Sequence, residues 1–180
     1  KSIDTMAESF TNSLTRAAGI VTTSSSGSIG AGVTIITGIS TDGIAVGDMV
    51  RNVHFRGGAK VAYIDAGQVR LDKTSTNITA VSSQSVSFLG VTTALTAASK
   101  SILVGGTFCN LTDVTVKLFV EVGSGDSLSL LANNIPVPQG SSFVISDAGK
   151  TILQTNEEIR VYCDTSSAID VNLSVLAGVS

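Results

Sequence analysis

The sequence predicts an all-β protein built from two small modules. Short runs rich in β-branched residues recur from residue 20 onward, separated by Gly, Asn, Asp and Ser. Two runs alternate with the period of a strand and place on one face Val116, Leu118, Val120 and Val122, or Ile169, Val171, Leu173 and Val175. We therefore expect an N-terminal barrel-like β module, preceded by a short helix or arm, and a C-terminal antiparallel β-sandwich.

Residues 1–19 show a helical spacing of apolar side chains. The residues that step by three or four, and would share one helical face, are Ile3, Met6, Phe10, Leu14 and Ala17. Because so short a helix is marginal in water, it needs a partner surface. It could pack on its own module or dock, as an arm, on a neighbouring subunit. The second alternative predicts inter-subunit contacts by Ile3, Met6, Phe10 and Leu14, and an arm that is dispensable for folding.

Residues 20–90 predict the small barrel-like module. Five short β runs lie between the turn signals of this segment: "VTIITGIS", "GDMVRNVHF", "KVAYID", "QVRLD" and "SVSFLG". That many short strands in so few residues are typical of a small barrel or sandwich. Residues 91–101, "VTTALTAASKS", have less β character and predict a connector.

Residues 102–180 predict the antiparallel sandwich, in which the stretch "NNIPVPQGSSFVIS" holds both prolines of the chain. Proline fixes φ and removes a donor, so it suits strand edges and starts. Gly140 permits the positive φ of a turn. We expect a short strand over 135–137, a turn, and a second strand over 142–145.

Composition narrows the functional classes. Charged residues make up only 14% of the chain, against about a quarter in typical globular proteins, which suits a protein that buries its exterior against other subunits. A net charge of −3 and the lack of a Lys/Arg cluster argue against nucleic acid as a partner. No apolar run is long enough for a membrane helix, and the opening "KSIDTMAESF" lacks the apolar core of a signal peptide. We expect a soluble protein made in a reducing cytoplasm, with no membrane partner.

Residues that could carry chemistry are few. The single histidine, His54, lies in an expected strand, and we predict a structural and not a catalytic role for it. Cys109 and Cys163 lie in apolar stretches that predict two small buried side chains, with a disulfide as the alternative. The run "GSIGAG" imitates a phosphate loop, but a strand and not a helix follows it. We therefore expect no enzyme, no catalytic residue, no cofactor and no metal site.

Both halves resemble modules of tailed-bacteriophage virion proteins. In the C-terminal half, "SILVGGTFCNLTDVTVKLFVEV", "NNIPVPQGSSFVI" and "LQTNEEIRVYCDTSSAIDVNLSVL" resemble a β-sandwich module common in virions, in which "IPVPQGSSF" links the two sheets. In the N-terminal half, "ITGISTDGIAVGDMVRN" and "GGAKVAYIDAGQVRLD" are similar to another small β module of phage structural proteins. The N-terminal segment lies outside the resemblance.

The resemblance implies a structural virion protein. Among virion parts, a two-module β chain of this length fits a capsid decoration (cement) protein, which binds the outside of the shell and bridges neighbouring capsomers. Its partners would be the major capsid protein and copies of itself, most simply as a homotrimer, on the capsid exterior after synthesis in the host cytoplasm. The alternatives are a tail, neck or fibre-attachment component, or an appendage that binds host surface glycan. Aromatic residues at 4%, without Trp, argue against the glycan alternative.

Overall fold

The computed structural model describes residues 8–23, 26–125, 127–146 and 151–179. Within them the chain forms seventeen strands and no helix, so the all-β prediction is confirmed. Backbone contacts divide the chain into two compact units. We call residues 1–18, 92–161 and 167–180 the sandwich unit, and residues 19–91 and 162–166 the inserted unit.

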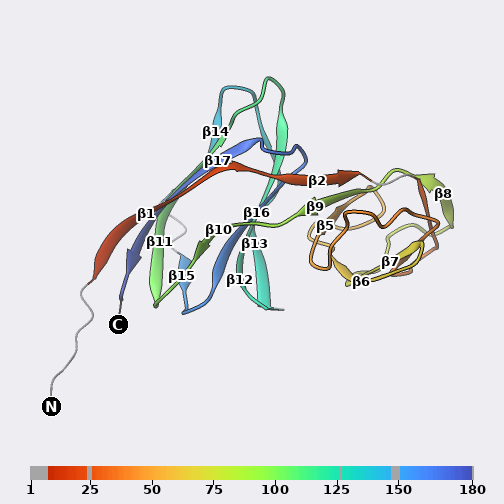
Figure 1. Cartoon of the computed structure of the whole chain (residues 1–180), viewed down its shortest axis with the longest axis horizontal. Coiled ribbons are helices and arrows are strands. Elements are labelled where there is room, and N and C mark those ends of the chain that lie inside the picture. The colour runs from red at the N-terminus through yellow and green to blue at the C-terminus, as the bar shows by residue number, and fades with distance from the viewer. Residues whose placement is uncertain (1–7, 24–25, 126, 147–150, 180) are drawn as a thin grey trace, which may run out of the picture. The chain divides into compact units, whose positions relative to one another are not determined.

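The sandwich unit contains two antiparallel sheets (Figure 1). The first, which we call the β11 sheet, has the order β1-β17-β11-β14, and β15 also pairs with β11. Its strands are β1 (Ser9–Ala18), β11 (Ser101–Asn110), β14 (Ser142–Ile145), β15 (Thr151–Leu153) and β17 (Ile169–Ala177). The second, the β12 sheet, has the order β10-β16-β12-β13. Its strands are β10 (Thr92–Thr96), β12 (Val116–Ser124), β13 (Ser127–Val137) and β16 (Glu158–Cys163).

Alternate residues of these strands form the core of the sandwich unit. The β11 sheet contributes Phe108 and Leu173, and the β12 sheet contributes Leu118, Ile159 and Val161, all of them fully buried. Each such side chain stabilises the fold by about 1.5–3 kcal/mol relative to its exposed state. The period-two face of 169–175 is buried throughout, whereas the face of 116–122 is interrupted by register shifts around Val120 and leaves Val122 only half-buried.

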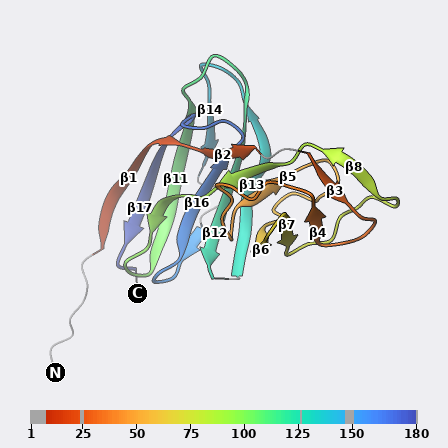
Figure 2. The same cartoon turned by 45° about the vertical axis from the view of Figure 1, so that its right-hand side comes forward.

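The predicted helix at the N-terminus is wrong. Phe10, Leu14 and Ala17 lie in β1, which pairs antiparallel with β17 from Ser9↔Ala177 onward, while Ile3 and Met6 lie outside the described residues. The helical spacing rested on a few apolar residues, and a ladder that is regular from Ser9 to Thr15 outweighs so weak a propensity. Figure 2 shows β1 beside β17 along its length.

The predicted connector 91–101 is also wrong in part. Its residues Thr92–Thr96 form β10, which pairs with β16 at the edge of the β12 sheet. Sequence propensity alone did not reveal this strand because its stability comes from pairing and from the burial of Ala94.

The proline corner is confirmed. The strand predicted over 135–137 is the end of the longer β13, and the strand predicted over 142–145 is β14. Gly140 has φ 65°, and Ser141 donates its backbone N–H to the carbonyl of Pro138 at 3.2 Å. Since β13 lies in the β12 sheet and β14 in the β11 sheet, this turn links the two sheets.

The inserted unit has two further antiparallel sheets, of orders β2-β9-β5 and β6-β7-β4-β3-β8. Their strands are β2 (Ile20–Thr23), β3 (Gly27–Ile29), β4 (Ile35–Thr37), β5 (Met49–Arg51), β6 (Val61–Asp65), β7 (Gln68–Leu71), β8 (Val81–Gln84) and β9 (Ser87–Gly90). Ile29, Ile36, Val69 and Phe88 lie fully buried in their common core. Neither sheet closes on itself, so the barrel-like prediction is corrected to two small open sheets.

Candidate functional site

The single histidine has a structural backbone role. His54 lies in a turn after β5 and not in a strand, which corrects the prediction. Its backbone N–H donates to Asn52 Oδ1 at 2.8 Å, and its carbonyl accepts from the Thr76 backbone N–H at 2.7 Å. These bonds tie the 52–55 turn to the loop around Thr76. Within the described residues, no group of His, Cys, Asp or Glu side chains lies close enough to hold a metal ion.

The two cysteines are free thiols in different surroundings. Cys163 is buried as predicted, and this burial raises the pKa of its thiol to about 11. Cys109 is only half-buried, since it lies on the outward side of β11, so its predicted burial is corrected. The alternative of a disulfide is wrong.

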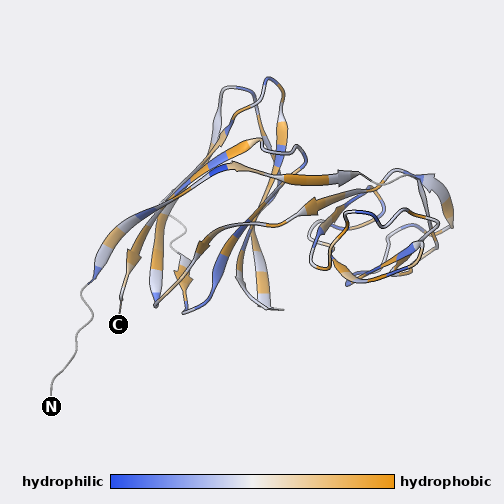
Figure 3. Ribbon diagram, viewed as in Figure 1, coloured by the Kyte–Doolittle hydropathy of each residue, from blue (hydrophilic) through white to orange (hydrophobic). Residues whose placement is uncertain are grey.

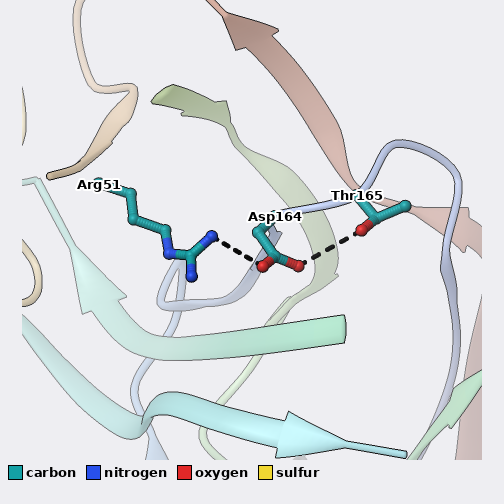
Figure 4. A network of polar contacts seen from close by, with 3 residues as sticks. All are labelled: Arg51, Asp164 and Thr165. Atoms are coloured by element: carbon teal, nitrogen blue, oxygen red, sulfur yellow. Dashed lines mark hydrogen bonds and ion pairs between the residues drawn. The ribbon is translucent and has the colours of Figure 1, made fainter. Parts of the chain in front are cut away.

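A charged network joins the 162–166 segment to β5 within the inserted unit. Arg51 donates from Nη1 to Asp164 Oδ2 at 2.8 Å, and the Thr165 hydroxyl donates to Asp164 Oδ1 at 3.4 Å (Figure 4). The Val21 backbone N–H donates to Ser166 Oγ at 3.1 Å. This arrangement holds a loop in place and offers no reactive group.

The most unusual surface is the outward side of the β11 sheet. In an antiparallel sheet, paired residues point to the same side, and the buried partners Phe108 and Val171 identify the inward side. The opposite side carries a first row, which runs through the register pairs Phe10↔Leu176, Leu176↔Ile102 and Ile102↔Ile152. This row is apolar across its whole width.

A second row crosses the same side further along the strands. It runs through Leu14↔Asn172, Asn172↔Thr107 and Thr107↔Val144, so it is apolar at both ends. The two rows, with the Cys109↔Asp170 pair beside the second, define what we call the outer face. Phe10 is 74% exposed, Leu14 70%, Val144 57% and Ile152 55%. Figure 3 shows hydrophobic colour recurring along the strands of this sheet.

A hollow of about 330 Å³ opens beside the second row. Its lining includes Leu14, Thr107, Cys109 and Asn172, with Arg16 and Asp170 as its charged members. The Asp170 carboxylate accepts the Ala17 backbone N–H at 2.8 Å, which holds the irregular end of β1. The hollow is therefore a depression in the outer face, lined by Leu14 and by the polar members of the second row.

A smaller hollow lies on the inserted unit. Its volume is about 140 Å³, and Ile35, Tyr63, Gln68 and Arg70 line it. An exposed ring beside polar groups is a feature of sugar sites, but this hollow is well below the roughly 300 Å³ of typical small-molecule sites. It gives the glycan alternative a candidate position without a formed pocket.

Of the predicted contact residues, the structure places Phe10 and Leu14 on the outer face, while Ile3 and Met6 lie outside the described residues. Ile102, Val144, Ile152 and Leu176, the other apolar members of the two rows, were not predicted as contact residues. One signal was present: "SILV" at 101–104 is apolar at both odd and even positions, which indicates a strand with two apolar sides.

No protein-family model, curated protein or solved structure matches this chain. Among the described residues there is no helix long and apolar enough to cross a membrane.

Proposed function

We propose that this chain is a structural protein of a tailed-bacteriophage virion, and that it acts as a capsid decoration (cement) protein. In that role it binds the outside of the shell and bridges neighbouring capsomers, with the major capsid protein and copies of itself as partners. The observation that carries the proposal is the outer face, because a monomeric protein would be expected to keep so apolar a sheet surface covered.

The residues around the outer face support a binding role over a chemical one. Its described polar members, such as Asn172 and Thr107, are neutral, and Asp170 is engaged with backbone. A surface of this kind gains free energy by losing water when a partner covers it. Charged residues make up only 14% of the chain, which fits a protein whose exterior is largely covered in its assembly.

The proposal is tested on purified particles of the phage that encodes this sequence. Quantitative mass spectrometry should detect the chain at a copy number on the order of hundreds, as expected for a protein that repeats over an icosahedral shell. A copy number of about six or twelve would assign it instead to the tail or neck. Absence from the particles would overturn the virion role altogether.

A second experiment separates decoration from a glycan-binding appendage. Recombinant chain should bind shells from which it has been removed and raise the temperature at which they break. Tyr63→Ala should leave this binding unchanged, because decoration does not need the hollow beside Tyr63. Loss of particle attachment to host cells in that variant, with normal shell binding, would support the glycan alternative.

A further inference from the structure

We infer that the outer face of the β11 sheet is the surface through which two copies of this chain pack, sheet against sheet. The inference rests on the proposed structural role, because an assembly protein needs contacts with its own copies, and it names the surface that provides one. Its occupant is a second copy of the same chain.

The residue pattern of the outer face is self-complementary. The apolar first row lies towards one end of the strands and the second row, with Leu14 and Val144, towards the other. Between them lies a polar pair, in which the Ser174 hydroxyl donates to Asn12 Oδ1 at 3.1 Å. On β1 the order along the strand is therefore apolar, polar, apolar, whereas on the central strands β17 and β11 the second row is polar, at Asn172 and Thr107. A two-fold axis that runs parallel to the strands, between β17 and β11, would place the apolar first row on its own copy, Leu14 on Val144 and Asn172 on Thr107.

The electrostatics of the outer face do not oppose self-association. Among the paired residues that the structure describes on this face, Asp170 is the charged one, and Arg16 lies in the same hollow with the opposite charge. A face that two copies share must not bring many like charges together, because like-charge juxtaposition costs several kcal/mol. If the partner were instead a different protein with a charged binding surface, most charges of that partner would find no opposite charge on the outer face.

The size of the outer face is sufficient. Three long strands, with β14 and β15 sharing the position beside β11, give a width of about 19 Å at about 4.8 Å per strand. The length of β11 adds about 33 Å, so the footprint is about 600 Å² on each copy. Two copies would bury about 1,200 Å², at the lower limit of stable specific interfaces. Face-to-face sheets about 10 Å apart interdigitate their side chains in this way.

The test measures oligomeric state by light scattering and analytical ultracentrifugation. Wild-type chain should be dimeric or larger at micromolar concentration. The variant Leu14→Lys/Val144→Lys places two charges on the second row and should weaken association by about a hundredfold or more. The matched control is Val53→Lys/Ile78→Lys, which changes apolar residues that are 85% and 93% exposed on the inserted unit and should associate like wild type. Circular dichroism confirms that each variant keeps its β structure.

A second measurement needs no destabilising charge. Ser174→Cys in a Cys109→Ser background places a thiol on the central strand β17, between the two rows and beside the proposed two-fold axis. Mild oxidation should give a covalent dimer, whereas Ile78→Cys in the same background should stay monomeric on denaturing gels. The inference is overturned by a monomeric wild-type chain, by an unchanged oligomer in Leu14→Lys/Val144→Lys, or by equal cross-linking at both positions.

These results are separable from those on virion function. A dimer formed through the outer face by a chain that is absent from particles would support the inference and overturn the virion role. The opposite result is also possible: the Leu14→Lys/Val144→Lys variant is fully incorporated into particles and the wild-type chain is monomeric in solution. That result would support the virion role and overturn the inference.

Discussion

At the scale of the residue, the two thiols should differ in reactivity. Burial raises the pKa of Cys163 from its ordinary 9.0 to about 11, so at pH 8 its thiolate fraction falls by about a hundredfold. Cys109 is half-buried on the outward side of β11 and is open to reagents in a free subunit. Iodoacetamide at pH 8 should alkylate Cys109 and leave Cys163 intact in folded protein that is dilute enough to be monomeric, as measured by peptide mass spectrometry. Equal alkylation of both in native conditions would contradict this assignment.

Asn110 is a buried polar residue of the sandwich unit with several side-chain hydrogen bonds. It is 4% exposed, and its Nδ2 donates to the carbonyls of Val114 and Val137 at 2.7 and 2.9 Å. Its Oδ1 accepts from the Thr112 backbone N–H and hydroxyl, both at 2.8 Å. Asn110→Ala removes these four hydrogen bonds, one of them to the carbonyl of the buried Val137, and should lower the free energy of unfolding by about 1–3 kcal/mol. Denaturant titration measures this, and the exposed Asn133→Ala should change it by less than about 0.5 kcal/mol.

At the scale of the element, β1 is part of the sandwich, which reverses the expectation that the first residues are dispensable. Its ladder with β17 runs from Ser9 to Ala18, and the Ser13 hydroxyl donates to the Ala94 carbonyl of β10 at 2.7 Å. Deleting residues 1–18 removes this ladder and exposes the edge of β17. The truncated chain should lose the cooperative unfolding of the sandwich unit in calorimetry.

The control for that deletion keeps the strand and removes only its outward side chains. Phe10→Ala/Leu14→Ala should unfold close to wild type, because both side chains are mostly exposed and contribute little to a single subunit. If the deletion were harmless, β1 would be an arm and not a member of the sheet.

The sequence predicted the class of the fold and several elements, and the physical reason is periodicity. The 169–175 alternation and the proline corner are local signals, and both appear where they were expected. β1 and β10 were missed because their stability comes from partners far along the chain, β17 and β16. For the same reason the outer face could be only half predicted: Phe10 and Leu14 were named, but register alone unites them with Ile152 and Val144.

At the scale of the whole molecule, the chain enters the inserted unit twice, once through residues 19–91 and again through 162–166. The second segment, 162–166, is short, and two polar contacts attach it to the rest of the unit. These are the ion pair of Arg51 with Asp164 and the hydrogen bond from the Val21 backbone N–H to Ser166 Oγ. The Lys60 ammonium also lies 5.5 Å from the centre of the Tyr162 ring. The stability of the inserted unit therefore depends on a segment that follows it by some seventy residues in the chain.

The 162–166 segment gives the last prediction. Asp164→Ala removes the carboxylate that Arg51 and Thr165 share, at a cost of about 1 kcal/mol, since Arg51 is partly exposed and solvent screens the pair. Hydrogen exchange should then accelerate in β5 and β9 of the inserted unit, while amides of β11 and β17 in the sandwich unit keep their wild-type protection. Asp42→Ala, at an exposed turn of the inserted unit, serves as the control and should leave both groups of amides unchanged. An equal loss of protection in both units would mean that they unfold as one cooperative body.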